Sequence, residues 1–130
     1  MPRHLTPAGI RAPFARYSHA VEVEAGARLL FCSGQLGISE HDVIPEDAGE
    51  QASLCFDAIR RCLTEAGMDV ADVVRINAYV IDRAFMAPYM AARDKFVADP
   101  PPASTLMIVS GFTRPEFKVE VEVVAAKADG

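Results

Sequence analysis

Two carboxylates near the end of the chain, Glu120 and Glu122, stand in the stretch FKVEVEVVAA at a spacing that could support proton transfer. Residues i and i+2 of a β-strand point to the same face, so these side chains would lie next to each other. Two like charges this close raise the pKa of a carboxyl group, unless Lys118 on the same face neutralises them. A carboxylate of this kind can orient water and accept its proton, which is the chemistry of a hydrolase.

The cysteines and histidines give less evidence of a catalytic or metal-binding site than the two carboxylates do. The three cysteines are odd in number and lack the C-x-x-C spacing of redox or metal sites. Cys32 has no identifiable His or Asp partner, so we expect it to pack as a small hydrophobic residue and not to act as a nucleophile. The three histidines are scattered without the spacing of metal ligands. We therefore expect no metal and no other cofactor.

The stretch DPPPASTLMIVSG, residues 99–111, joins three prolines to an apolar run. Proline fixes φ and removes a backbone donor, so Pro100–Pro102 should end the preceding helix and hold the next strand at a fixed angle. The small residues that follow, Ala103, Ser104 and Thr105, either line a pocket or belong to an ordinary helix-to-strand connection. The sequence leaves both interpretations open.

Composition limits the possible partners. With 130 residues, 51% of them hydrophobic, the chain is expected to form one domain over residues 1–130. Its net charge of −5 and the lack of a window dense in Lys and Arg argue against nucleic acid. No apolar run reaches the ~18 residues of a membrane span, and the N-terminus has no apolar leader segment. We expect a cytoplasmic protein that binds neither nucleic acid nor membrane.

Hydrophobic periodicity predicts the order β-β-α-β-α-β-β. In the first helix Asp47 is the expected N-cap and Gly67 the expected C-cap, and Pro88 fits only in the first turn of the second helix, which should begin near Ala87. The first two strands are expected to pair as a hairpin through the turn at 24–28. The predicted strands cover 18–24, 29–34, 72–82, 104–111 and 117–126, and the helices cover 47–66 and 87–99.

Two helices can cover one face of this sheet, so the other face must be polar or paired with a second subunit. Strand 72–82 alternates, with an apolar face and a polar face made of Arg75, Asn77 and Tyr79. Strand 104–111 is apolar on both faces, which a one-sided sheet in a monomer would not need. We infer an oligomer built through the face without helices.

Four stretches together resemble the Rid family, the YjgF-like reactive intermediate deaminases: RYSHAVEVEAGARLLFCSGQLG, EAGMDVADVVRINAYVID, PPAST and FKVEVEVVAA. The resemblance runs from about Ala12 to Ala126. It implies an α+β, chorismate-mutase-like fold with two helices on one face of a mixed sheet. It also implies a homotrimer with a small-molecule cleft between neighbouring subunits. The best-known members hydrolyse enamines or imines to a 2-keto acid and ammonia.

The resemblance also assigns residues. Glu120 matches the carboxylate that positions water, Tyr17 matches a loop tyrosine, and Ser33 and Gly34 match the end of a strand. In the best-known members an arginine in a Pro-x-Arg-Ser/Thr context grips the substrate carboxylate. Ala103 occupies that position here, and Tyr89 falls where an asparagine is common.

Because alanine cannot hold a carboxylate, we expect little acceleration of 2-iminopropionate or 2-aminoacrylate hydrolysis. Arg16, beside Tyr17, and Arg114, in a lengthened loop, are candidate substitute anchors, with Ser104 and Thr105 as further binding residues. A cleft without any cation would argue against 2-imino acid substrates.

Three functions remain open at this point. The first is hydrolysis of a small imine, enamine or related C=N metabolite with a non-standard anchor. The second is a trimer that binds a metabolite without turnover. The third, a ribonuclease, is disfavoured by the acidic balance and the lack of a basic, aromatic strip. Non-catalytic roles also remain open for two of these residues: Glu120 as a solvated strand residue or part of an interface ion pair, and Tyr17 as a packing residue with its hydroxyl at the surface.

Overall fold

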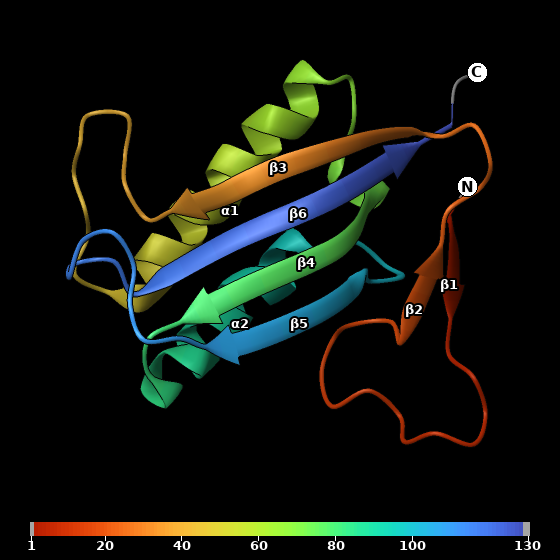
Figure 1. The fold of residues 1–130 in the computed structure, drawn as a ribbon, viewed down its shortest axis with the longest axis horizontal. Helices are drawn as coiled ribbons and strands as arrows, with labels where there is room; N and C mark the ends of the chain where they lie inside the picture. Colours follow the sequence, from red (N-terminus) through yellow and green to blue (C-terminus); the bar gives the residue numbers. More distant parts are fainter. Residues whose placement is uncertain (1, 129–130) are drawn as a thin grey trace.

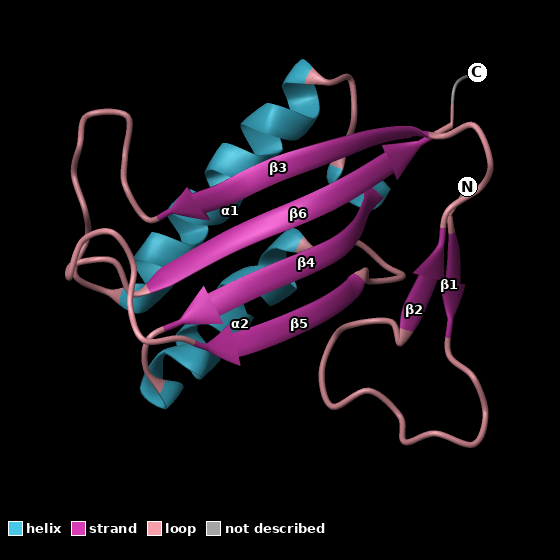
Figure 2. Ribbon diagram, viewed as in Figure 1, coloured by secondary structure: helices cyan, strands magenta, loops and turns pink. Residues whose placement is uncertain are grey.

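The computed structural model describes residues 2–128 as a mixed four-stranded sheet with two helices packed on one face (Figures 1 and 2). The opposite face carries no helix, as the sequence predicts. The fold is α+β, and the helix-free face is where the polar residues of the central strands lie. A small two-stranded sheet from the N-terminal segment stands beside the start of β5 (Figure 1).

The elements follow the predicted order, with one additional strand at the N-terminus. The strands are β1 (Arg3–Leu5), β2 (Ala20–Glu22), β3 (Arg28–Leu36), β4 (Val73–Val80), β5 (Ala103–Ile108) and β6 (Val119–Lys127). The long helices are α1 (Ala48–Glu65) and α2 (Met86–Phe96), and short 3₁₀ turns cover Val70–Asp72 and Arg83–Phe85.

Helix α1 is capped at both ends by the residues that the sequence indicates. The carboxylate of Asp47 accepts a hydrogen bond from the backbone N–H of Glu50 at 2.9 Å. At the other end Gly67 takes a positive φ of 70°, and the N–H of Met68 reaches back to the carbonyl of Leu63 at 2.8 Å. This is a Schellman motif, in which glycine avoids the steric cost of the left-handed conformation.

The main sheet has the order β3-β6-β4-β5, with β6 antiparallel to both of its neighbours and β5 parallel to β4. The odd-numbered residues of β6 from Val119 to Ala125 are at most 2% exposed and pack under the helices. Phe56 of α1 stacks on Phe96 of α2 with ring centroids 4.5 Å apart. The core therefore lies between the helices and one face of the sheet.

The predicted hairpin between strands 18–24 and 29–34 is wrong. β2 pairs with β1, in the register His4 to Val21, and β3 pairs with β6. The turn at 24–28, with Gly26 at a φ of 80°, redirects the chain between two sheets. Three residues from the N-terminus supply the partner that β2 needs, and their sequence shows no alternation that would reveal a strand.

Gln51, a fully buried polar residue of α1, holds the loops at the β6 end of the sheet. Its Nε2 donates to the carbonyls of Pro45 (2.8 Å) and Glu116 (2.9 Å), and its Oε1 accepts from the N–H of Lys118 (2.9 Å). All three contacts satisfy polar atoms of the buried Gln51 amide, which would be costly to leave without partners. The first residues of β6, including Glu120, are thereby fixed relative to α1.

Candidate functional site

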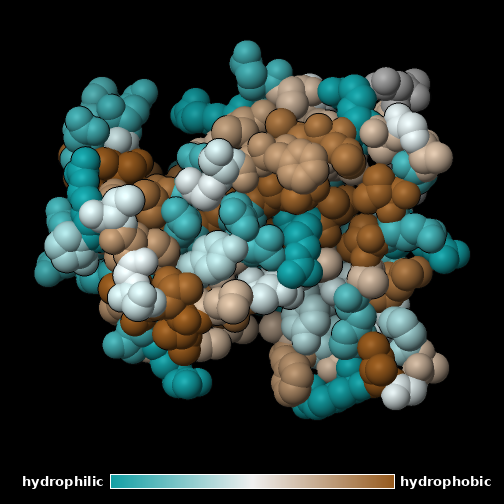
Figure 3. Space-filling model, in the orientation of Figure 1, coloured by the Kyte–Doolittle hydropathy of each residue, from teal (hydrophilic) through white to brown (hydrophobic). Residues whose placement is uncertain are grey.

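The helix-free face carries a polar centre beside a hydrophobic area. The hydrophilic side chains come from the middle of β4 and β6, while exposed hydrophobic residues, among them Leu29 and Phe31, gather over β3 (Figure 3). Phe31 is 71% exposed and Leu29 54% exposed. An apolar area of this kind next to polar groups is typical of a surface that meets another molecule.

Glu120 lies at the β3 side of this face, against the backbone of Gly34. A Cβ atom built on Gly34 would stand 2.6 Å from Cδ of Glu120, so a larger residue there would require the Glu120 side chain to move. A β-bulge between Cys32 and Gln35 places Ser33 and Gly34 opposite β6 at this point. The structure thus brings three of the predicted site residues, Ser33, Gly34 and Glu120, to one end of the face.

The Glu120 carboxylate is half-buried, and no donor among residues 2–128 hydrogen-bonds to it. Burial, together with the negative charge of Glu122, raises its pKa above the ordinary glutamate value. Lys118 does not offset this effect, because its Nζ donates to the carbonyl of Glu46 and lies 5.5 Å from the Phe85 ring. Among the described residues the Glu120 carboxylate thus combines a raised pKa with the lack of a hydrogen-bond donor.

Glu122, in contrast, is held by neighbours on β4. Its Oε1 accepts a hydrogen bond from the Tyr79 hydroxyl at 2.8 Å and from Nδ2 of Asn77 at 3.3 Å. The bond to Glu122 is the main reason that the pKa of Tyr79 is raised. A hollow of about 400 Å³ borders this group and is lined in part by Phe31, Ser33, Asn77 and Glu122.

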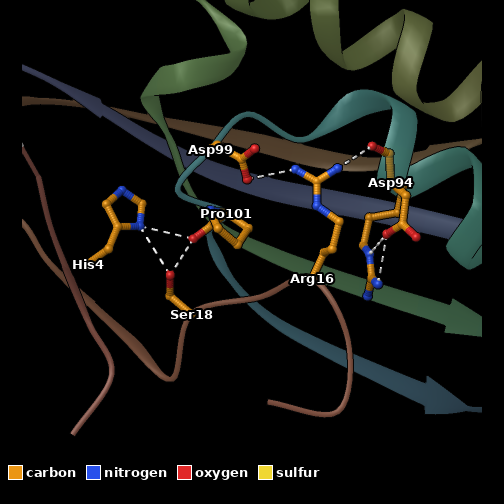
Figure 4. A network of polar contacts seen from close by, with 7 residues as sticks. His4, Arg16, Ser18, Asp94, Asp99 and Pro101 are labelled. Atoms are coloured by element: carbon orange, nitrogen blue, oxygen red, sulfur yellow. Dashed lines mark hydrogen bonds and ion pairs between the residues drawn. The ribbon is translucent and has the colours of Figure 1, made fainter. Parts of the chain in front are cut away.

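At the other end of the face, the N-terminal segment is hydrogen-bonded to the proline run 100–102 (Figure 4). The Ser18 hydroxyl and Nδ1 of His4 both contact the carbonyl of Pro101, at 2.6 and 2.9 Å, and the N–H of Ser18 donates to the carbonyl of Pro102 at 3.0 Å. These bonds fix the start of β5 relative to the loop that carries Tyr17. The proline run is therefore a docking point for the N-terminal segment.

Arg16 belongs to the same docking point (Figure 4). Its guanidinium donates to the carbonyl of Asp94 at 2.9 Å and to Oδ1 of Asp99 at 2.8 Å, across the end of α2. Both contacts are structural, so the structure does not present Arg16 as a free substrate anchor. Tyr17 is half-buried; its hydroxyl accepts a bond from the N–H of Phe14 at 3.2 Å, and its ring meets His19 edge-on.

Strand alternation separates the three residues at the start of β5. Ala103 and Thr105 pair with Arg75 and Asn77 on the helix-free face, whereas Ser104 pairs with the buried Ile76 and points to the helix side. Ser104 is therefore not brought to the helix-free face. Arg75, which sequence reasoning did not select, stands directly beside Ala103. The polar face of strand 72–82 was the signal that could have identified it.

Two further predicted residues lie elsewhere. Tyr89 is a fully buried residue of α2 whose ring centroid lies 6.0 Å from that of Phe56, so the structure places it in the core and not at the helix-free face. Arg114 is exposed on the loop before β6, with Cζ 5.9 Å from the Phe117 ring. Cys32 is buried, and this burial raises the pKa of its thiol to about 11.

Other features of the described residues do not add a second site. A larger cavity, of about 570 Å³, lies between α1 and α2, but none of the predicted catalytic or binding residues lines it. Within residues 2–128 no group of three or more His, Cys, Asp or Glu side chains could hold a metal ion. Neither helix in this part of the chain has the length and apolarity to cross a membrane.

The chain resembles known proteins along almost its whole length. The family model described as endoribonuclease L-PSP matches residues 9–127. TdcF of Escherichia coli strain K12, provisionally named a reactive intermediate deaminase, is 25% identical over 123 residues, which are 91% of this chain and 93% of TdcF.

Solved structures give the same result. The Rid-family protein YyfB of Yersinia pestis superposes with a TM-score of 0.84 at 25% identity, over 97% of this chain and 98% of that one. NMB1025 of Neisseria meningitidis, a YjgF-family protein, is 30% identical with a TM-score of 0.71, over 100% and 98% of the two chains. The chain belongs to the endoribonuclease L-PSP family, which is also called the Rid, YjgF or RutC family.

Proposed function

We propose that this protein is a homotrimer that hydrolyses a small imine, enamine or related C=N metabolite at a cleft between subunits. The observation that carries the proposal is the Glu120 carboxylate, which is half-buried, has no donor among the described residues and has a raised pKa. The family relationship supports the reaction type, since TdcF is provisionally named a reactive intermediate deaminase.

In the proposed reaction a water molecule adds to the electrophilic carbon of C=N while Glu120 accepts one of its protons. The nitrogen takes up a proton, and the resulting tetrahedral aminol collapses to C=O as ammonia leaves. One water is consumed, and one ketone or keto acid and one ammonia are formed. Burial and the charge of Glu122 raise the pKa of Glu120, which makes its carboxylate a stronger base for this transfer.

The positions of the two groups of residues support an intersubunit site. Ala103 pairs with Arg75, and Glu120 pairs with Tyr79, so they stand four residues apart along β4. At ~3.3 Å per residue this is about 13 Å along the strands, and they are also separated across the sheet. A small metabolite does not span that distance, so a second copy must bring its Glu120 to the Tyr17 and Ala103 end.

Trimer formation has independent support. The exposed Leu29 and Phe31 border the polar centre, on the face that has no helix. The family is known to form trimers. Light scattering or sedimentation should therefore give a trimer, and a monomer would remove the proposed cleft and with it the proposed function.

The activity test supplies small imines formed in situ by an oxidase and traps the unreacted fraction with semicarbazide. Wild-type protein should lower the yield of trapped imine for at least one of them. Glu120→Gln, which keeps the shape but loses the basic oxygen, should lower kcat at least about tenfold with the trimer intact. Cys32→Ser should change kcat little, because the thiol is buried and largely protonated near neutral pH.

Two results would contradict this mechanism: an undiminished Glu120→Gln variant, or an inactive Cys32→Ser variant that still forms the trimer. If no imine is hydrolysed while small metabolites bind at the cleft, the protein is a trimeric binding protein without turnover.

A further inference from the structure

Arg75 occupies the place beside Ala103 on the helix-free face. The two residues are register partners on the parallel strands β4 and β5, which run about 4.8 Å apart. Ala103 is small, so the head group of Arg75 can extend over β5. It does so, since its Nη2 donates to Oγ1 of Thr105 at 2.6 Å.

The guanidinium of Arg75 is held by neutral groups. Besides Thr105, its Nε donates to Oδ1 of Asn77 at 3.0 Å. No carboxylate among residues 2–128 forms an ion pair with it, whereas Arg3, Arg16, Arg60 and Arg93 each contact an acidic side chain. The Nη1 group has no acceptor among the described residues. Arg75 therefore keeps its full positive charge and free donors for another molecule.

Its position is fixed by a chain of hydrogen bonds that ends at Glu122. Asn77 donates to Glu122 through Nδ2 and accepts from Arg75 through Oδ1, so the amide has one orientation that satisfies both contacts. The Tyr79 hydroxyl donates to the same Oε1 atom of Glu122 at 2.8 Å. A guanidinium held in place before the ligand arrives loses little entropy on binding.

We propose that Arg75 binds the carboxylate of a small organic anion at this site. Arg75 belongs to β4, and its guanidinium extends over β5 in the space that the small side chain of Ala103 leaves. This inference rests on the proposed function, because the anion is the substrate or product whose reacting carbon faces Glu120 of the neighbouring subunit. It makes Arg75 the residue that selects anionic over neutral ligands. Arginine forms two parallel charge-assisted bonds to a carboxylate, which neutral side chains cannot replace.

The binding test compares 2-oxobutyrate with its neutral amide, by calorimetry on the wild-type trimer and on variants. Wild-type protein should bind the carboxylate at least about tenfold more tightly than the amide. Arg75→Gln should abolish that preference while the oligomeric state is unchanged. Arg61→Ala, which removes the same charge from the exposed surface of α1, should retain it.

A transposed pair makes the test more specific. Arg75→Ala combined with Ala103→Arg returns a guanidinium to the same place from the other strand, so at least part of the carboxylate preference should return. Arg75→Ala alone should lack it. The inference is overturned if Arg75→Gln keeps the wild-type preference, if the transposed pair stays indifferent to charge, or if wild-type protein binds neither ligand.

The two proposals fail in different ways. If Glu120→Gln abolishes turnover but carboxylate preference does not depend on Arg75, the inference on Arg75 alone is wrong. If carboxylate preference depends on Arg75 while Glu120→Gln leaves turnover unchanged, the hydrolytic mechanism alone is wrong.

Discussion

The two ends of the helix-free face differ in how their polar groups are satisfied. At the β5 end, Arg75 is bonded to Asn77 and Thr105, and the segment before Ala103 is bound by Ser18 and His4. At the β3 end, the Glu120 carboxylate lies against the Cα of Gly34 without a hydrogen-bond donor among the described residues. One end is held by many bonds and the other keeps its charged group unpaired.

This contrast matches two chemical tasks. A group that binds a ligand gains from being fixed in advance, because less freedom is lost when the ligand arrives. A group that accepts a proton gains from an environment that raises its proton affinity, which burial and a neighbouring Glu122 provide for Glu120. These hydrogen bonds and the raised pKa of Glu120 support our proposal that the β5 end binds the ligand and that the β3 end carries the base.

The largest effect is expected in the activity of mixed trimers, which tests whether the two ends of the face act in different subunits. Tyr17→Ala and Glu120→Gln should each lose most of the activity alone. When the two variants are unfolded together and refolded as mixed trimers, about one quarter of the intersubunit sites should combine an intact end from each. Activity should return to about that fraction. Mixing without subunit exchange is the control, and no recovery after refolding would place both ends in one subunit.

A smaller effect is expected in the pH dependence of kcat/KM, which should follow the protonation of Glu120 at the β3 end. Because the pKa of Glu120 is raised, the base is lost as the pH falls through a value above the ordinary glutamate range, and kcat/KM should fall with it. Glu122→Gln removes the neighbouring negative charge and should move the midpoint of this fall to lower pH. Glu65→Gln, on the exposed surface of α1, is the matched control and should leave the profile unchanged. A midpoint that is the same in all three proteins would mean that Glu120 is not the titrating base.

The smallest effect is expected at Tyr89, which belongs to neither end. Its hydroxyl is buried and has no hydrogen-bond partner among the described residues, so Tyr89→Phe should raise the free energy of unfolding by about 1 kcal/mol. The measurement is chemical denaturation beside steady-state kinetics, with kcat/KM expected to stay constant. A clear loss of kcat/KM would return Tyr89 to the substrate-binding residues.

The sequence predicts the main sheet and helices because their signals are local. The apolar residues of 47–66 recur at three and four positions, Asp47 and Gly67 have the chemistry of caps, and Pro88 fits one turn of a helix. The pairing of β2 is not local. Its partner is Arg3–Leu5, a segment whose three residues carry no strand pattern, so an adjacent turn suggested the wrong neighbour.

The site could be predicted only in part. Glu120, Gly34 and Ser33 were each selected from the family resemblance, and the pairing of β3 with β6 brings them together. The sequence analysis selected Arg16 as a candidate anchor and did not select Arg75, because the two arginines differ in their tertiary contacts and not in residue type. Arg16 meets an acidic partner 83 positions away, and Arg75 has none among the described residues. Only the register of β4 against β5 shows that Arg75 lies beside Ala103.

The central position of β6 has a consequence for how the protein is made. β6 is the last strand along the chain, yet it lies between β3 and β4, and within residues 2–128 β3 pairs with β6 alone. During synthesis the backbone groups of β3, and those of β4 that face β6, stay unpaired until residues 119–127 leave the ribosome. Sheets that depend on such distant pairings fold slowly, and their waiting edges can join the wrong chain. Chaperone demand in the cell should therefore centre on the interval between the emergence of β3 and that of β6.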